Sequence, residues 1–299
     1  MTRSGIAQAA LLLALAALGA WAAGASAQRV LVGTWNAANF GSTSDVQSRA
    51  EVVGKFDVLA LQEVLSEHAM RNLIVELEMQ SALQTGSRRH WNYLLSPAVG
   101  SGGFQERYAF VYCTDRVSLV AEGPQGLYPE AAEGDFVREP FFATFRAGLF
   151  DFTLVTVHII WGNASAQRTT ECQRLVSVWN WVQALDPVEN DVILLGDFNR
   201  DRPTHSAFAP LRALGISALL TARGTRTTLG AKNSGGYWYD NLWTDLQYTR
   251  SEWTGDVGVG IPGDNTYGCP CSEARRGVSD HCPAWAVFST LADDDPPDP

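Results

Sequence analysis

Outside its first 27 residues, the sequence has no apolar run long enough to cross a lipid bilayer as a helix. Near the start, Arg3 precedes an Ala-rich apolar run over residues 9–23, and Ala25-Ser26-Ala27 forms an A-x-A cleavage site before Gln28. These three features are typical of a secretory signal peptide. We therefore expect residues 1–27 to be a signal peptide and the protein to be secreted or periplasmic, without stable membrane insertion.

Positive charge is also scarce, because 22 Lys and Arg stand against 32 Asp and Glu, a formal net charge of −10. Bulk charge therefore does not favour a general polyanion-binding protein. A phosphate substrate is not excluded, because a local cluster of side chains with a divalent cation can supply positive potential. The acidic, Pro-rich residues 291–299 are expected to form a disordered tail.

Cysteine is rare and odd in number, with five residues in the chain. In an exported protein some of them are expected to oxidise, and an odd number leaves at least one free. A local disulfide is predicted between Cys282 and either Cys269 or Cys271. A zinc cluster is the alternative, although C-x-C is a poor spacing for structural zinc. Cys113 and Cys172 fall in a predicted strand and helix and are expected to be buried thiols.

The chain shows no internal repeat and no long linker, so one domain is expected over residues 28–290. Apolar, β-branched runs predict strands and amphipathic runs predict helices. Strands are predicted over residues 29–35, 57–61, 91–95, 107–112, 116–121, 136–145, 150–157, 191–195, 237–243 and 282–288. Helices are predicted over 44–54, 66–83, 166–185 and 203–214, and loops over 122–135 and 254–277. Segments 107–112 and 116–121, and segments 136–145 and 150–157, are expected to form hairpins. This order favours an α+β sandwich of two packed sheets flanked by helices.

Several predicted strands deliver polar side chains at their ends, and this pattern carries the functional prediction. The run Val192–Leu195 is followed at once by Gly196, Asp197 and, two residues later, Asn199. Carboxylates gathered at one rim of a sandwich repel one another unless a cation lies among them. Oxygen ligands favour Mg²⁺, with Mn²⁺ or Ca²⁺ as alternatives, over zinc. The residues at such positions are Asn36, Glu63, His158, Asp197, Asn199, Asp240, Asp280 and His281.

Some of these residues have a simpler structural interpretation. Asn36 could be a turn residue, Glu63 could cap the following helix, and Asp280-His281 could be a loop pair. Asp240 differs, because it follows Tyr239 within an apolar strand. An unpaired carboxylate there would cost ~2–7 kcal/mol or more. We therefore expect Asp240 to have a partner, and a histidine is the natural one.

Taken in order, Trp35-Asn36, Gln62-Glu63, Gly196-Asp197-Phe198-Asn199 and Ser279-Asp280-His281 resemble the motifs of the endonuclease/exonuclease/phosphatase superfamily. Three further motifs extend the resemblance to its deoxyribonuclease I branch, and they are Glu106-Arg107-Tyr108, Arg138-Glu139-Pro140 and Tyr239-Asp240. The likeness runs from about Val30 to Phe288. The segment Trp161-Gly162-Asn163 after His158 resembles bacterial exported members.

The resemblance implies a four-layer α/β/β/α sandwich, with two mostly antiparallel sheets face to face and helices outside. It also implies roles for individual residues. Glu63 would be the principal metal ligand, helped by Asp280 and Asn36. His281 would be the general base, oriented by Asp240, while Asp197 and Asn199 would position the nucleophile or hold a second metal. His158, paired with Glu106, would stabilise the phosphate or assist the leaving group. Arg138, Arg107 and Tyr108 would contact substrate.

Together these features predict a monomeric, divalent-metal-dependent phosphodiesterase that hydrolyses DNA as an endonuclease. The chemistry agrees, because displacement at phosphorus needs a base, a cation and donors for the leaving oxygen. One alternative is a phosphodiesterase of the same fold acting on a phospholipid or an inositol phosphate. Leu65 and Phe104 replace an Arg and a Tyr expected from the branch, which leaves the substrate open. The other alternative is a binding module, which would be expected to have lost a catalytic residue.

Overall fold

The computed structural model describes residues 28–295, except 102–104, 130–135, 163, 223–225, 230–235 and 263–277. The predicted signal peptide, Cys269 and Cys271 therefore lie outside the described residues. Within the described part of the chain, no helix is long and apolar enough to cross a membrane.

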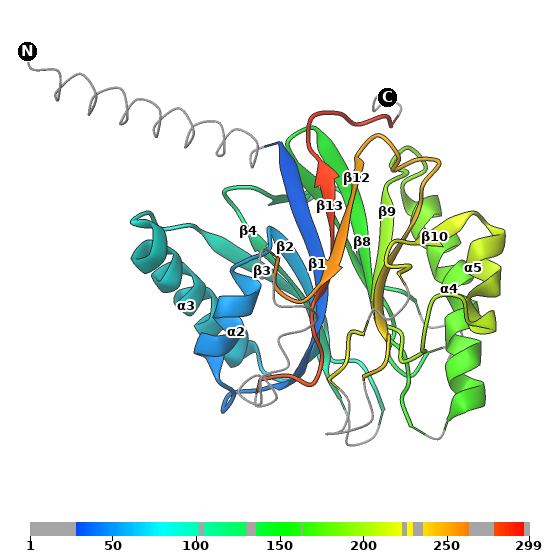
Figure 1. The fold of residues 1–299 in the computed structure, drawn as a ribbon, viewed down its shortest axis with the longest axis horizontal. Helices are drawn as coiled ribbons and strands as arrows, with labels where there is room; N and C mark the ends of the chain where they lie inside the picture. The colour runs from blue at the N-terminus through cyan, green and yellow to red at the C-terminus, as the bar shows by residue number, and fades with distance from the viewer. Residues whose placement is uncertain are drawn as a thin grey trace, which may run out of the picture.

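Two β-sheets form the centre of the molecule (Figure 1). The first has the strand order β12-β13-β1-β2-β4-β3, and the second has the order β10-β11-β9-β8-β7-β5 with β6 paired to β7. The first sheet contains β1 (Arg29–Phe40), β2 (Val58–Val64), β3 (Trp91–Leu95), β4 (Arg107–Cys113), β12 (Trp253–Val259) and β13 (Ala284–Ser289). The second contains β5 (Ser118–Leu119), β6 (Gln125–Leu127), β7 (Phe141–Ala147), β8 (Phe150–His158), β9 (Val192–Asp197), β10 (Ile216–Ala218) and β11 (Asp240–Asp245). The pairs β1–β2 and β8–β9 are parallel, and the others are antiparallel.

Helices cover the outer face of each sheet, which gives four layers. Helices α2 (Val46–Val53) and α3 (Glu67–Thr85) pack on the first sheet. Helix α4 (Ser165–Leu185), the short η1 (Ser206–Phe208) and α5 (Ala209–Ala213) pack on the second. Apolar side chains from both sheets form the central core between them. The predicted α+β sandwich with two mostly antiparallel sheets is confirmed.

Strand β9 shows how the sequence produces this layering. Ile193 and Leu195 face the core between the sheets, whereas Val192 and Leu194 face helix α4. Because successive side chains of a strand point to opposite faces, a strand covered on both faces must be apolar throughout. Gly196, the penultimate residue of the strand, has φ of 142°, and a Cβ atom there would lie 2.1 Å from the carbonyl oxygen of Val157. Only glycine fits this close approach of β8 and β9.

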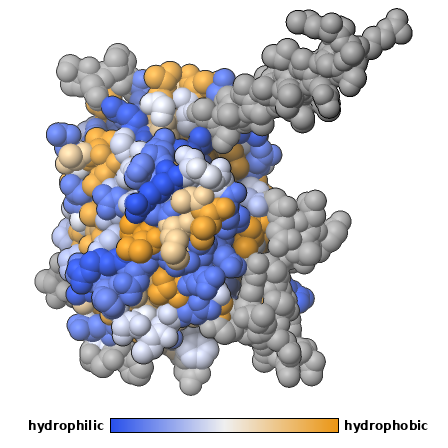
Figure 2. Space-filling view, turned by 90° about the vertical axis from the view of Figure 1, so that its left-hand side faces the viewer, coloured by the Kyte–Doolittle hydropathy of each residue, from blue (hydrophilic) through white to orange (hydrophobic). Residues whose placement is uncertain are grey.

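Helix α3 begins where the sequence predicts it. The side chain of Ser66 accepts a hydrogen bond from the backbone N–H of Ala69, and Gly86 ends the helix with φ of 73°. Three apolar residues at four-residue spacing, Val75, Met79 and Leu83, are exposed on it. Figure 2, which looks at the left-hand side of Figure 1, shows apolar and polar side chains interleaved over that face.

Several sequence predictions about the fold are wrong, including the loop over residues 122–135, which contains β6. Residues 116–121 do not form a hairpin with 107–112, because β4 lies between β2 and β3 while β5 pairs with β7 in the other sheet. Residues 254–277 are not all loop, since β12 covers Trp253–Val259 at the edge of the first sheet. Residues 136–140 precede strand β7 instead of belonging to it.

The acidic tail also differs from expectation in its described part. Asp293 accepts a hydrogen bond from the backbone N–H of Asp151 at 3.1 Å, and Asp295 accepts one from Asn190 at 2.9 Å. The segment up to Asp295 is therefore packed against the body, whereas residues 296–299 lie outside the described part. Cys282 is disulfide-bonded, and Cys113 and Cys172 are buried free thiols.

Candidate active site

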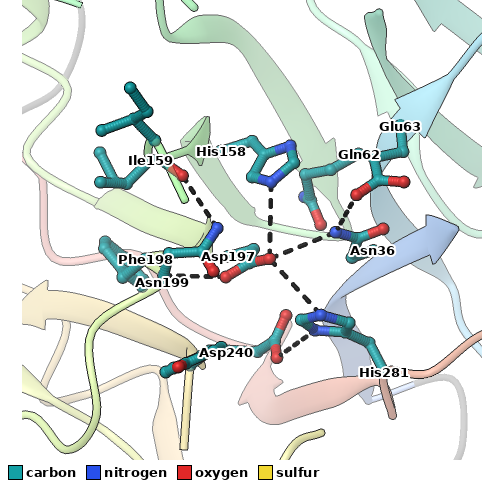
Figure 3. A network of polar contacts seen from close by, with 12 residues as sticks. Asn36, Gln62, Glu63, His158, Ile159, Asp197, Phe198, Asn199, Asp240 and His281 are labelled. Atoms are coloured by element: carbon teal, nitrogen blue, oxygen red, sulfur yellow. Dashed lines mark hydrogen bonds and ion pairs between the residues drawn. The ribbon is translucent and has the colours of Figure 1, made fainter. Parts of the chain in front are cut away.

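The polar residues predicted at strand ends gather at one end of the sandwich, around Asp197 (Figure 3). Asp197 ends β9, and the strand register places His158 of β8 on one side of it and Asp240 of β11 on the other. Asn36 of β1 and Glu63 of β2 approach from the opposite sheet, because β1 and β2 also run parallel toward this rim. The site is therefore built where the carboxyl ends of two parallel strand pairs meet.

His281 and Asp240 form one histidine–carboxylate pair. The Nδ1 atom of His281 lies 2.8 Å from Oδ2 of Asp240, and its Nε2 lies 3.6 Å from Oδ2 of Asp197. The backbone N–H of His281 donates to Oγ of Ser279, and its carbonyl accepts from the indole N–H of Trp35. These contacts leave Nε2 as the ring nitrogen directed toward the centre of the site.

His158 and Glu106 form a second pair with the same arrangement. Nδ1 of His158 lies 2.8 Å from Oε1 of Glu106, and its Nε2 lies 3.6 Å from Oδ2 of Asp197. Arg138 forms an ion pair with Glu106, with Nε 2.9 Å from Oε2. The Tyr108 hydroxyl accepts a hydrogen bond from the backbone N–H of His158 at 3.0 Å. Each of the two pairs joins a strand residue of the second sheet to a residue that lies shortly before a strand of the first, namely β4 or β13.

Glu63 and Asn36 form a third part of the site. The Asn36 amide donates to Oε1 of Glu63 at 2.8 Å and to Oδ2 of Asp197 at 3.2 Å. The backbone N–H of Asn39 donates to Oε2 of Glu63. Glu63 has a left-handed φ of 58°, which a residue other than glycine adopts only where the surroundings enforce it. This backbone turn directs the carboxylate toward the rim.

Asn199 is likewise held in the left-handed region, with φ of 47°. Its backbone N–H donates to Oδ1 of Asp197 at 2.8 Å, and its side-chain amide donates to the carbonyl of Ile159 at 2.9 Å. One oxygen of Asp197, Oδ1, is thus held by the backbone of Asn199, and the other, Oδ2, faces both histidines.

Burial and mutual charge shift the ionisation of these groups. Burial lowers the pKa of His281, but the carboxylates of Asp240 and Asp197 outweigh this effect and raise the pKa to about 10. Burial raises the pKa of Asp240 to about 6, opposed by His281. For His158, the nearby charge of Glu106 outweighs burial and raises the pKa. Burial acts to raise the pKa of Glu106, but His158 and Arg138 together lower it.

Three predicted site residues are placed differently from the central group. Asp280 is exposed, and among the described residues its carboxylate makes no hydrogen bond or ion pair, although its charge acts on His281. Arg107 donates to the backbone carbonyl of Ser96 at 2.8 Å. Tyr108 is fully buried, which does not suit the predicted contact with substrate. Its hydroxyl instead holds the backbone of His158.

Several residues that hold the site have no predicted role from the sequence. The buried carboxylate of Glu171 on α4 accepts the backbone N–H groups of Val137 and Ile160, next to Arg138 and near His158. Gln62 donates to Thr34 in its own sheet and to Thr156 in the other, both at 2.9 Å. The position of a polar residue, Gln62, within an otherwise apolar strand was the sequence feature that could have indicated this structural role.

Comparisons with known proteins place this geometry in a family. No family model matches the sequence. A protein named deoxyribonuclease from Thioalkalivibrio sp. (strain K90mix) is 31% identical over 278 residues, which cover 87% of this chain and 72% of the relative. The chain belongs to the deoxyribonuclease I-like branch of the endonuclease/exonuclease/phosphatase superfamily. Its similarity to deoxyribonucleases identifies it as a phosphodiester hydrolase.

Other superfamily relatives agree. Human deoxyribonuclease-1 is 31% identical over 198 residues, covering 63% of this chain and 65% of the relative. A bovine protein named endonuclease/exonuclease/phosphatase family domain-containing protein 1 is 27% identical, and the chain spans about half (49%) of its length. Among solved structures, an endonuclease/exonuclease/phosphatase family protein from Bacteroides thetaiotaomicron gives a TM-score of 0.57 at 16% identity, covering 87% of this chain and 97% of that one. Truncated Caenorhabditis elegans TDP2 gives 0.55 at 15% identity, with 87% and 98% coverage. These structures show the shared fold.

Proposed function

We propose that this protein is a secreted, divalent-metal-dependent endonuclease that hydrolyses DNA. One observation carries the proposal: two histidines, each bound at Nδ1 by a carboxylate, direct Nε2 to within 3.6 Å of the same oxygen of Asp197. Such an arrangement places two proton-transfer groups on either side of one point. Relatives named deoxyribonuclease support DNA as the substrate, and the predicted signal peptide supports secretion.

The chain's own residues account for the proton transfers of phosphodiester hydrolysis. With Asp240 on Nδ1, His281 presents Nε2 to a water molecule and can accept its proton. Asp197, held by the backbone of Asn199, is placed to orient that water. Glu106 raises the pKa of His158, which favours the protonated ring, and the protonated ring can donate a hydrogen bond to a phosphoryl or leaving oxygen.

The residues present fit a divalent cation. Glu63 offers a carboxylate at the rim, Asn36 an amide oxygen, and Asp280 a carboxylate without a protein partner among the described residues. When bound there, a divalent cation such as Mg²⁺ supplies positive charge that neutralises phosphoryl oxygens and offsets the carboxylates around His281. A cation there would lower the pKa of His281, which favours the neutral imidazole that can act as a base.

The experiment that tests this proposal is plasmid nicking by the purified protein with Mg²⁺, Mn²⁺, Ca²⁺ or EDTA. We expect metal-dependent nicking that His281→Ala reduces about a thousand-fold, equivalent to ~4 kcal/mol of transition-state stabilisation. His68→Ala is the matched control, because this histidine is exposed on α3, where its ring is hydrogen-bonded to the side chain of Asn72.

Three results would contradict the proposal. Near-wild-type nicking by His281→Ala would remove this histidine from the reaction. Nicking that persists in EDTA would remove the metal. Absence of cleavage by a folded protein under every metal would reject DNA, and a phospholipid or inositol phosphate would then be assayed. Tyr237, exposed and stacked on Tyr239 at a centroid distance of 4.9 Å, would be the first surface to examine for a lipid substrate.

A further inference from the structure

A second group of carboxylates lies at the opposite end of the sandwich from the active site. Asp191 directly precedes β9, and Asp197 ends that strand, so the two are separated by about 20 Å at ~3.3 Å per residue. Figure 1 shows the C-terminal segment at the upper end of the molecule, where β13 ends. We call this group the distal cluster, and it consists of Glu189, Asp191, Glu252, Asp294 and Asp295.

The distal cluster has the spacing of a cation site. One ligand oxygen each from Glu189, Asp191 and Asp295 lie within 4.8 Å of one another, and so do oxygens from Asp191, Glu252 and Asp294. Asp191 belongs to both sets and is the centre of the cluster. The contributing residues come from three places in the chain: the α4–β9 loop, the β11–β12 connection and the segment after β13.

The environment of the Asp191 carboxylate is that of a cation ligand. The Asp191 side chain is fully buried, yet neither carboxylate oxygen has a hydrogen-bond partner among the described residues. Glu252 is also fully buried, and its Oε2 has no hydrogen-bond partner within the part of the chain that the structure describes, while its Oε1 accepts from the Ser251 hydroxyl at 2.7 Å. Leaving a buried charge unpaired costs several kcal/mol, so buried carboxylates are normally paired or coordinate a metal.

The rest of the cluster is already held in place. Oε1 of Glu189 accepts the backbone N–H of Asp191 at 2.7 Å, and Oδ2 of Asp295 accepts the N–H of Asn190 at 2.9 Å. These bonds use one lone pair of each carboxylate and leave others free. Asp294 is exposed, which gives the cluster access to solvent. Glu189 and Asp295 also line a cavity of about 330 Å³ next to the distal cluster.

We propose that the distal cluster binds a structural divalent cation, with Ca²⁺ the best fit, and that this ion fixes the C-terminal segment to the start of β9. Ca²⁺ takes six to eight oxygen ligands in flexible geometry, whereas Mg²⁺ demands a near-ideal octahedron and keeps several waters. Five carboxylates from three separate segments suit the more flexible ion. The site is independent of the active site and of its proposed metal.

The test is thermal unfolding of metal-stripped protein in the Glu63→Gln background, which removes the principal predicted ligand of the active-site metal. At a hundred-fold excess over its dissociation constant, Ca²⁺ should raise Tm by about 5–8 °C, and Mg²⁺ by less. Asp191→Asn should abolish the Ca²⁺ shift. Asp256→Asn should retain it, because Asp256 is an exposed residue of β12 paired with Arg29.

Asp294→Asn provides a second test that holds even if the Asp191 variant fails to fold. Because Asp294 is exposed, its replacement should leave the fold intact and weaken Ca²⁺ binding about ten-fold by isothermal titration calorimetry. The proposal is overturned if Ca²⁺ leaves Tm unchanged, or if the shift survives Asp191→Asn. Neither result depends on nuclease activity, so the proposed function stands or fails separately.

Discussion

The two ends of strand β9 bury carboxylates in opposite circumstances. At the active-site end, Asp240 is bound by His281, and Glu106 is bound by His158 and Arg138. At the distal end, Asp191 is equally buried but forms no hydrogen bond through its carboxylate to any described residue. Burial alone therefore does not define a role for a carboxylate. What distinguishes the ends is whether the chain itself supplies the compensating positive charge.

The comparison predicts that the same chemical change, removal of one negative charge, acts in opposite directions at the two ends. At the active-site end the carboxylate holds a cation or imidazole in place, so neutralising it breaks a pair. At the distal end the carboxylates repel one another when no metal is bound, so neutralising one relieves repulsion.

The largest expected effect is that of Asp240→Asn on catalysis. An asparagine cannot stabilise a charged His281, and its amide can favour the wrong tautomer, so Nε2 no longer serves as the base. We expect kcat/KM for DNA cleavage to fall about a thousand-fold, ~4 kcal/mol. Asp256→Asn is the matched control with unchanged rates, and a rate for Asp240→Asn within a few-fold of wild type would contradict the assigned orientation.

Glu106→Gln should cost stability as well as activity. It leaves Arg138 and His158 buried without their shared partner, which should lower the free energy of unfolding by about 2–3 kcal/mol at pH 7. Activity should fall about a hundred-fold, since His158 is then less readily protonated. Urea denaturation and initial rates measure the two effects.

The pH dependence of that loss has a defined sign. The folded-state pKa of Glu106 is lowered, so its stabilising contribution is complete above the unfolded-state value of about 4.5 and disappears as pH falls through the folded value. The stability difference between wild type and Glu106→Gln should therefore shrink below about pH 4.5. A difference that is constant from pH 7 down through this range would show that the charge of Glu106 is not what stabilises the fold.

The sequence predicted the active-site end well because its signal is local. An apolar strand that stops abruptly at Asn36, Glu63 or Asp197 must place that polar side chain at a rim of the core. Strand pairing is not local, which explains why residues 116–121 were assigned to the wrong sheet. The turn after β4 carries the chain across to β7, and nothing in the segment itself marks that crossing.

The distal cluster gave no such signal. Asp191 looked like the first residue of a strand, Glu252 stood in no motif, and the acidic tail looked too polar to pack. Only folding brings these three segments together. Tyr108 shows the same limit, because its motif suggested a substrate contact, whereas full burial makes it a support for His158.

The smallest predicted effect is at the distal end, where removing a carboxylate should stabilise the metal-free fold. In metal-free protein at pH 7, Asp191→Asn should raise the free energy of unfolding by about 1 kcal/mol, with unchanged DNA cleavage. Among the described residues, the acidic groups that face or surround Asp191 are Glu189, Glu252, Asp293, Asp294 and Asp295, and Arg146 lines the adjoining cavity. Burial and these acidic neighbours raise the pKa of Asp191 to about 9, and burial raises the pKa of Glu189 to about 10.

An acid whose folded-state pKa is raised destabilises the fold above its unfolded-state value, increasingly as pH rises toward the folded value. The stabilisation by Asp191→Asn should therefore grow from about pH 4 to about pH 9 in EDTA, as measured by urea denaturation. Saturating Ca²⁺ should reverse its sign, because the wild-type carboxylate then gains a partner that the amide holds poorly. A variant less stable than wild type in EDTA across this range would mean that the chain already compensates Asp191, and the contrast between the two ends of β9 would be lost.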